Sequence, residues 1–265
     1  MQRSLDKRLV ILVESPEDCG VIDPHLNDSE VQTSPGYGME SVLVAAQIFW
    51  DNQIGEVIAV VDADLDRYTG RQHSSNVVMT EFYDLDADVL FHCPQALNPI
   101  LANFTDKTLR QPYLASRGTS AYDIIWEMAI AVGEVRYYSI MQQCGFNIRG
   151  FPLADVVKGY ERADTLASVV AVALIRTPSA ASITASDVAA EVAALPDKKY
   201  VASGHDLMSA LATLSRMRWG STAGATMLAS ALRIATQCPC WKQTIVYSFV
   251  QQWASQFTVK AWTCP

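Results

Sequence analysis

The stretch Glu56-Val-Ile-Ala-Val-Val-Asp62-Ala-Asp64 is an unbroken apolar run that ends in two acids. Arg8-Leu-Val-Ile-Leu-Val-Glu14 has the same form nearer the start of the chain and also ends in an acid. Apolar runs without polar alternation are typical of strands that are buried on both faces of a parallel sheet. The two stretches therefore predict core strands of an α/β fold.

Three further segments extend this strand–helix alternation. We expect a short strand over Val31–Ser34, a helix over Gly38–Asn52, where apolar residues recur at helical spacing, and another strand over Asn76–Phe82. The polar stretch Arg67–Ser75 is predicted to be a loop. Alternation of this kind predicts a parallel sheet with right-handed crossovers.

Beyond about residue 100 the pattern becomes helical. Apolar periodicity predicts helices over 120–143, 162–176, 184–195, 206–218, 221–235 and 243–257. A length of 265 residues suits about two domains. We expect an α/β domain over 1–104 and a mostly α-helical domain over 105–265.

The composition narrows the class of protein. The chain is 50% hydrophobic and 18% charged, which excludes a disordered chain. Its longest apolar runs fall short of the ~20 residues that span a bilayer, and the start lacks a secretory leader pattern, so we expect a cytoplasmic protein without a membrane partner. A net charge of −8 gives no overall basic field, so contact with nucleic acid would depend on metal ions and local basic patches.

Six cysteines are scattered through the chain. Cys238-Pro-Cys240 lacks a second pair at the spacing of a zinc ribbon. We therefore expect ordinary reduced thiols and no structural zinc.

Acids follow three of the predicted strands: Glu14 with Asp18, then Asp62, Asp64 and Asp66, then Asp84, Asp86 and Asp88. The carboxyl ends of parallel strands share one edge of a sheet. Carboxylates gathered there repel each other unless a cation lies among them, and their hard oxygens suit Mg²⁺ or Mn²⁺. We predict Glu14, Asp62 and Asp64 as the metal ligands, with Asp66, Asp84 and Asp86 as candidates for further ligands. The alternative for each acid is a loop residue or a helix N-cap.

Four segments carry a resemblance to a known family. Ile11-Leu-Val-Glu14-Ser-Pro-Glu-Asp18 and Val60-Val-Asp62-Ala-Asp64 resemble the two motifs of a TOPRIM domain. Thr80-Glu-Phe-Tyr-Asp84-Leu-Asp86 and Ser203-Gly-His-Asp-Leu207 are similar to segments of stand-alone, OLD-like TOPRIM nucleases with a helical C-terminal part. The chain departs from the pattern at Ser15, where the motif has Gly, and at Asp86, where it has Glu.

The resemblance implies a Rossmann-like TOPRIM domain and a Mg²⁺-dependent endonuclease that hydrolyses phosphodiester bonds of RNA, tRNA included, or of DNA. Well-known members of this branch are toxic effectors of PARIS-type anti-phage defence, which an ABC-type ATPase partner controls. A homodimer is implied for the active form. No Walker A pattern occurs in the chain, so an ATPase would be a separate polypeptide.

The nuclease hypothesis also assigns catalytic and substrate-binding roles to other residues. One or two Mg²⁺ ions held by the acids would polarise the phosphoryl group and activate a water. His205 is a candidate general acid or base, because its ordinary pKa lies near neutrality; the alternative is a residue at a helix N-terminus. Substrate contacts are predicted for Arg67, Arg71, Lys158 and Arg162. The alternative for each is a solvated surface charge.

Three other functions stay open at this point. Metal-dependent phosphatases of the haloacid dehalogenase type also carry Asp-x-Asp after an apolar strand, but on their first strand. Nucleotide-sugar transferases use Asp-x-Asp after a longer nucleotide-binding half. The third is a non-catalytic regulatory or binding subunit with a TOPRIM-like fold, in which Ser15 and Asp86 would mark a decayed site.

Overall fold

A computed structural model describes residues 7–159, 164–180 and 182–265. The chain divides into two compact units. The sheet unit contains the described residues up to Cys93 together with Arg233–Pro265, and the helical unit is Pro94–Leu232. The sequence predicted one domain boundary at residue 104. In the structure the C-terminal segment Arg233–Pro265 belongs to the sheet unit, so the chain crosses between the two units twice. Helical periodicity indicates that a helix has an apolar face but not which core that face packs against.

The sheet has four parallel strands in the order β2-β1-β3-β4: β1 (Leu9–Val13), β2 (Val31–Pro35), β3 (Val57–Val61) and β4 (Val77–Met79). The predicted α/β class with a parallel sheet is confirmed. All five residues of β3 are buried, as expected for a strand covered on both faces. The last strand ends at Met79 and is shorter than predicted: the N–H of Thr80 still donates a 3.0 Å hydrogen bond to the Val61 carbonyl of β3, but its hydroxyl donates to the Phe82 carbonyl in the following turn.

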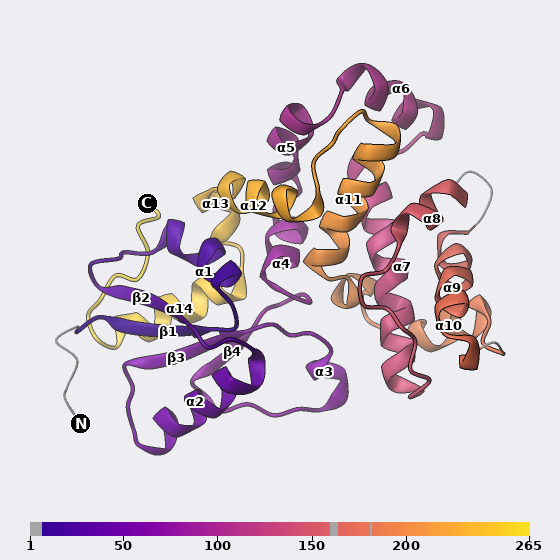
Figure 1. The fold of residues 1–265 in the computed structure, drawn as a ribbon. Helices are drawn as coiled ribbons and strands as arrows, with labels where there is room; N and C mark the ends of the chain where they lie inside the picture. Colours follow the sequence, from indigo (N-terminus) through magenta and orange to yellow (C-terminus); the bar gives the residue numbers. More distant parts are fainter. Residues whose placement is uncertain (1–6, 160–163, 181) are drawn as a thin grey trace. The chain divides into compact units, whose positions relative to one another are not determined.

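Helices cover both faces of this sheet (Figure 1). The helical elements of the sheet unit are α1 (Pro16–Ile22), η1 (Asp23–His25), α2 (Met39–Asp51), α3 (Asp66–Thr69), α4 (Leu85–His92), α13 (Cys238–Trp241) and α14 (Ile245–Ser255), of which α1, α2 and α14 contact the strands. Val42 and Ala46 of α2 pack against Ala59 and Val61 of β3. Helix α1 lies on the opposite side and contacts β1 and β2. The predicted loop after the central acids begins with α3 and becomes irregular only from Gly70.

The helical unit is built around α7 (Ala121–Met141), which packs against α9, α10 and α11. Its other elements are η2 (Pro94–Ala96), α5 (Leu97–Phe104), α6 (Lys107–Arg117), α8 (Leu153–Gly159), α9 (Thr165–Arg176), η3 (Pro178–Ala180), α10 (Ala185–Val192), η4 (Lys198–Val201), α11 (Gly204–Arg218) and α12 (Ala225–Ala235), which runs across the division. No strand occurs in its described residues. Within the described ranges, no helix has the length and hydropathy that a bilayer crossing requires.

Four cysteines of the sheet unit form disulfides. Cys93 at the end of α4 pairs with Cys240, and Cys238 pairs with Cys264. Cys19 and Cys144 are free. The expectation of reduced thiols was therefore wrong for these two pairs, because the positions of the partners in the chain gave no sign that the fold brings them together.

Candidate metal centre

Glu14 and Asp62 come together at the carboxyl edge of the sheet. Each follows the last residue of a strand by one position, β1 for Glu14 and β3 for Asp62, and these two strands pair in parallel. The backbone N–H of Asp62 donates a hydrogen bond of 2.8 Å to Oε1 of Glu14. The hydrogen bond fixes the Glu14 carboxylate beside the Asp62 backbone, whereas the predicted sharing of one cation by Glu14, Asp62 and Asp64 stays a prediction.

The turn that carries Asp62 and Asp64 is held by the segment after β4. The hydroxyl of Thr80 accepts a hydrogen bond of 2.8 Å from the backbone N–H of Ala63, and the carbonyl of Tyr83 accepts one of 2.9 Å from the N–H of Asp64. Asp64 has a φ of 41°, in the left-handed region that Asp tolerates better than most residues. The geometry of the Asp-x-Asp turn therefore depends on the next strand's loop.

The segment after β4 has its own internal support. The buried carboxylate of Asp88 accepts hydrogen bonds of 3.1 and 2.6 Å from the backbone N–H groups of Glu81 and Phe82. Burial raises the pKa of Asp88 to about 6, and these two hydrogen bonds oppose the rise. Asp88 is therefore a structural acid of the turn.

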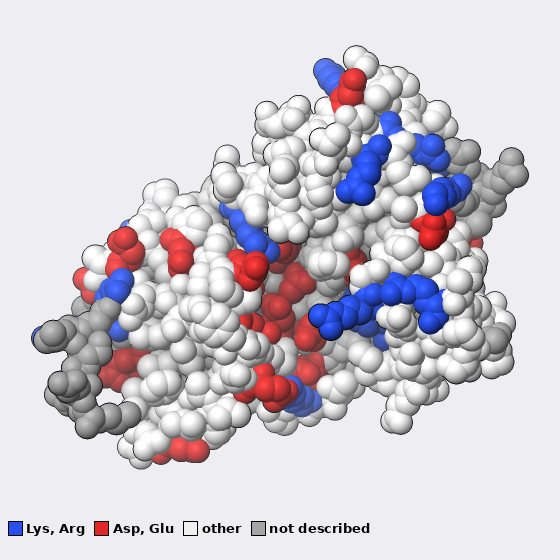
Figure 2. All heavy atoms as spheres, in the orientation of Figure 1, with Lys and Arg blue, Asp and Glu red and all other residues white. Residues whose placement is uncertain are grey.

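Seven carboxylates lie within electrostatic reach of one another at this edge, which we call the acidic edge: Glu14, Asp18, Asp62, Asp64, Asp66, Asp84 and Asp86. Figure 2 shows acidic side chains gathered beyond the strand ends of the sheet unit. Burial raises the pKa of Glu14 to about 7, and the neighbouring carboxylates Asp64, Asp18 and Asp66 add to the rise. Burial raises the pKa of Asp62 well above its ordinary value, with Asp84 the largest carboxylate contribution.

Two members of the acidic edge also cap helices. Ser15 is the N-cap of α1, and Asp18 completes a capping box by accepting a 2.8 Å hydrogen bond from the Ser15 N–H. Asp84 caps α4 by accepting a 2.8 Å hydrogen bond from the N–H of Ala87. The alternative interpretation of strand-end acids as N-caps therefore holds for these two, and Ser15 has a structural reason to stand where the motif has Gly.

Two other members lie against arginine or histidine side chains. Arg233 makes a bidentate pair with Asp86, with its Nε 3.0 Å from Oδ1 and its Nη2 2.7 Å from Oδ2. Nε2 of His73 lies 3.2 Å from Oδ2 of Asp66, and Nε of Arg71 lies 3.8 Å from the same oxygen. Sequence reasoning missed Arg233, which is 147 positions from its partner and has no motif around it.

The predicted substrate-binding cations have partners within their own units. Nη2 of Arg67 donates a 2.8 Å hydrogen bond to the Thr80 carbonyl, and Arg71 pairs with Glu40 at 2.8 Å. Lys158 lies on α8 of the helical unit and is 2.9 Å from Asp155. The fourth prediction, Arg162, lies outside the described residues.

His205 and Asp206 belong to the helical unit, at the start of α11. Their N-cap, Ser203, donates a 2.8 Å hydrogen bond to Asp206, which also pairs with Arg136. Burial alone would raise the pKa of Asp206, but hydrogen bonds from His205 and Arg136 and the charge of Arg136 hold it below its ordinary value. Asp206 is therefore a structural acid of the helix start, whereas the His205 side chain is exposed.

The carboxylate oxygens of the acidic edge are spread out and do not surround one common position. Among the described residues, no three of its acids place oxygens within 4.8 Å of one another; His25, Cys238 and Cys264 are the group that meets this spacing. An open site fits Mg²⁺, which keeps several waters and is commonly bound by one or two carboxylates plus substrate phosphates. The all-oxygen donors at this edge are of the kind that Mg²⁺ and Mn²⁺ prefer.

Comparison with protein-family models, with curated proteins and with solved structures found no match.

Proposed function

We propose that the protein is a metal-dependent nuclease whose centre is the acidic edge, with Glu14 and Asp62 as the principal Mg²⁺ ligands. The observation that carries the proposal is the hydrogen bond from the Asp62 backbone N–H to the Glu14 carboxylate, together with the raised pKa of both acids. Partly buried carboxylates that repel each other are costly to ionise at neutral pH. A divalent cation removes that cost.

The contacts of the remaining acids decide how well each could serve as a further metal ligand. Asp64 has a turn geometry fixed by the Tyr83 carbonyl and influences the pKa of both Glu14 and Asp62, so it is the best candidate for a third ligand. Asp86 and Asp66 are weaker candidates than the sequence suggested, because Arg233 and His73 already engage them.

The chain's own residues supply position. When bound, Mg²⁺ would polarise the phosphoryl group and lower the pKa of a bound water. Glu14 is oriented by the hydrogen bond from the Asp62 N–H, and as a metal ligand it would be ionised. Arg67 and Arg71 come from the segment that follows the central acids, and their contacts with Thr80 and Glu40 keep them beside the acidic edge.

The proposal keeps the family-level expectations as a hypothesis: an RNA or DNA substrate, a toxic effector role in defence, a controlling ATPase partner and a homodimeric active form. The runner-up is a non-catalytic binding subunit, which is favoured by one observation. Arg233 neutralises Asp86 inside the acidic edge, as expected where an acid serves structure rather than metal binding.

The test compares the full chain with Glu14→Gln. Labelled tRNA, other RNA and single- and double-stranded DNA are incubated with Mg²⁺, Mn²⁺ or a chelator. The matched control is Glu17→Gln, which removes an exposed acid of the neighbouring helix α1. We expect metal-dependent cleavage by the wild type and the control, and its loss in Glu14→Gln. No cleavage by the free wild-type chain, with Mn²⁺ binding absent as well, would contradict the proposal and leave the binding subunit.

A further inference from the structure

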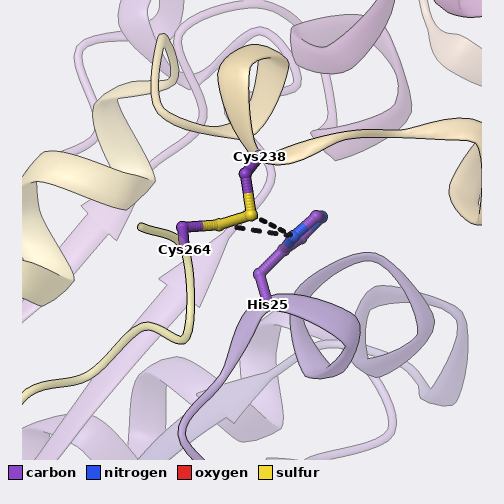
Figure 3. Close-up of side chains that lie close together, drawn as sticks. All are labelled: His25, Cys238 and Cys264. Carbon is purple, nitrogen blue, oxygen red and sulfur yellow. Dashed lines mark hydrogen bonds between the residues drawn. A yellow bond between two sulfur atoms is a disulfide. The ribbon is translucent and has the colours of Figure 1, made fainter.

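Three side chains that are far apart in the sequence meet inside the sheet unit: His25 of η1, Cys238 of α13 and Cys264 near the C-terminus. Nδ1 of His25 lies 3.7 Å from Sγ of Cys264 and 3.9 Å from Sγ of Cys238. Figure 3 shows the imidazole pointing at the disulfide that joins the two cysteines. This cluster, the His–Cys cluster, is separate from the acids considered above.

Backbone contacts hold the three residues in place. The N–H of Thr263 donates a 2.8 Å hydrogen bond to the His25 carbonyl, and the N–H of Asn27 donates one of 2.8 Å to the Ala261 carbonyl. Leu26 and Trp262 form an antiparallel bridge between the same two segments. The C-terminal segment is thus aligned with the end of η1, and Cys264 is placed against the imidazole by main-chain hydrogen bonds.

The surroundings of His25 favour a neutral ligand. The residue is only 4% exposed and stacks on Trp241, with ring centroids 5.4 Å apart. Burial lowers the pKa of His25, so the imidazole is neutral and a lone pair is available. Its Nε2 is buried and has no hydrogen-bond partner among the described residues. The other ring nitrogen, Nδ1, is the one that faces the two sulfurs.

The spacing suits a tetrahedral zinc ion. Zn–S bonds of ~2.3 Å and Zn–N bonds of ~2.0 Å place sulfur and nitrogen ligands about 3.6 Å apart around one Zn²⁺. The two observed N···S distances, 3.7 and 3.9 Å, are close to that value. The Cα atoms of the cysteines are 5.4 Å apart. Once the disulfide is reduced, the sulfurs are free to move by rotation about the Cα–Cβ bonds, and two thiolate ligands of one zinc ion lie ~3.8 Å apart.

We propose that the His–Cys cluster is a redox-controlled zinc site, in which reduced Cys238 and Cys264 and Nδ1 of His25 bind one Zn²⁺. A dithiol reductant cleaves the disulfide by exchange, giving two protein thiols and the oxidised reductant. Zn²⁺ then binds the two thiolates and releases two protons. A small disulfide oxidant reverses the sequence: it takes two electrons from the thiolates, becomes two thiols with two protons, and the re-formed protein disulfide frees the Zn²⁺.

This site differs in chemistry from the acidic edge. Two sulfurs and an imidazole are soft ligands that select Zn²⁺ over Mg²⁺. Three protein ligands leave one position of a tetrahedral ion for a water. The site joins η1, α13 and the C-terminal segment. When the Cys238–Cys264 disulfide is reduced, a bound ion would therefore hold residues 233–265 in place within the sheet unit.

The test measures zinc on the full chain. The protein is reduced with a dithiol, loaded with zinc sulfate, freed of excess metal, and its zinc content and affinity are measured by competition with a chelator. With excess Mg²⁺ present to occupy the acidic edge, we expect about one zinc per reduced wild-type chain and none on the oxidised chain. His25→Asn leaves the disulfide intact when oxidised, and should weaken zinc binding by at least about tenfold when reduced. Cys144→Ser, in the helical unit, is the matched control and should bind as the wild type does.

A second measurement needs no variant. Alkylation of the reduced wild type, read by mass spectrometry of its peptides, should be slow at Cys238 and Cys264 with zinc present and fast after chelation, whereas Cys144 should react equally in both. The proposal is overturned if the reduced wild type does not retain zinc, or if the oxidised chain or folded His25→Asn binds zinc as well as the reduced wild type does. It is also overturned if zinc does not slow the alkylation of Cys238 and Cys264.

Discussion

Replacing Glu14 by glutamine removes one negative charge from the acidic edge and keeps the shape of the side chain. The amide oxygen of glutamine can still accept the hydrogen bond that the Asp62 N–H donates. The variant therefore separates the electrostatic effect of this carboxylate from its place in the fold. We expect Glu14→Gln to be more stable than the wild type at alkaline pH when no divalent metal is present.

The magnitude follows from the pKa of Glu14. A pKa raised from 4.5 to about 7 means that the folded state holds the proton more tightly than the unfolded state. Below pH 4.5 both states are protonated and there is no penalty; the penalty grows as the pH rises toward 7 and is constant above it. At full strength it is about 3 kcal/mol, and because the side chain is partly exposed, solvent screening reduces it to roughly 1–2 kcal/mol.

The assay is unfolding of wild type and Glu14→Gln at about pH 5 and about pH 8, in chelator and in Mg²⁺. In chelator at the higher pH the variant should melt roughly 2–6 °C above the wild type, and the difference should shrink at the lower pH. Mg²⁺ should raise the wild-type melting temperature more than that of the variant. Glu17→Gln should follow the wild type throughout. Equal melting of Glu14→Gln and wild type at alkaline pH in chelator would refute the electrostatic account.

Three other substitutions test the packing around both units. Arg233→Met leaves Asp86 unpaired at the acidic edge and should lower the free energy of unfolding by about 2–3 kcal/mol, measured by urea denaturation. Gly133→Ala adds a methyl group where the backbone carbonyl of η4 touches α7, and should cost at least about 2 kcal/mol, measured by thermal unfolding. Ser15→Ala removes the N-cap of α1 and should cost about 1 kcal/mol, measured by urea denaturation.

Each of these has an outcome that would contradict it. For the glycine, Gly224→Ala is the matched control, since a methyl group there meets open space, and equal losses in the two variants would argue against the close approach. Unchanged stability of Arg233→Met at neutral pH would mean that its bidentate pair with Asp86 is not formed in solution. A loss well above 2 kcal/mol in Ser15→Ala would show that the serine does more than cap the helix.

The parts of the fold that were predictable have a local cause. The strands β1 and β3 were recognisable because short, unbroken apolar runs are typical of strands covered on both faces of a parallel sheet. Glu14 and Asp62 followed from the same reasoning, since parallel strands end at one edge. Helix α7 was recognisable from Ser120 onward, where a capping box begins a long apolar pattern.

The parts that were not predictable depend on contacts between distant segments. Nothing around Arg233 distinguishes it from a surface arginine, although it neutralises an acid that looked like a metal ligand. The pairing of Cys93 with Cys240 required knowing that the C-terminal helices leave the helical unit. His25 is an isolated histidine in the sequence. It contacts Cys238 and Cys264 only because the C-terminal segment packs in the sheet unit. Sequence periodicity carries no information on such partners.

The division of the sheet unit into two separated stretches has a consequence for biosynthesis. A ribosome delivers residues in order, so the four strands emerge long before Trp253, whose indole N–H donates a 2.8 Å hydrogen bond to the Gly55 carbonyl at the amino end of the sheet. Pro94–Leu232 is complete by then and is free to fold as an inserted body. One side of the sheet therefore stays uncovered until the C-terminal segment has been synthesised. The packing of that segment onto the sheet is a late step of folding.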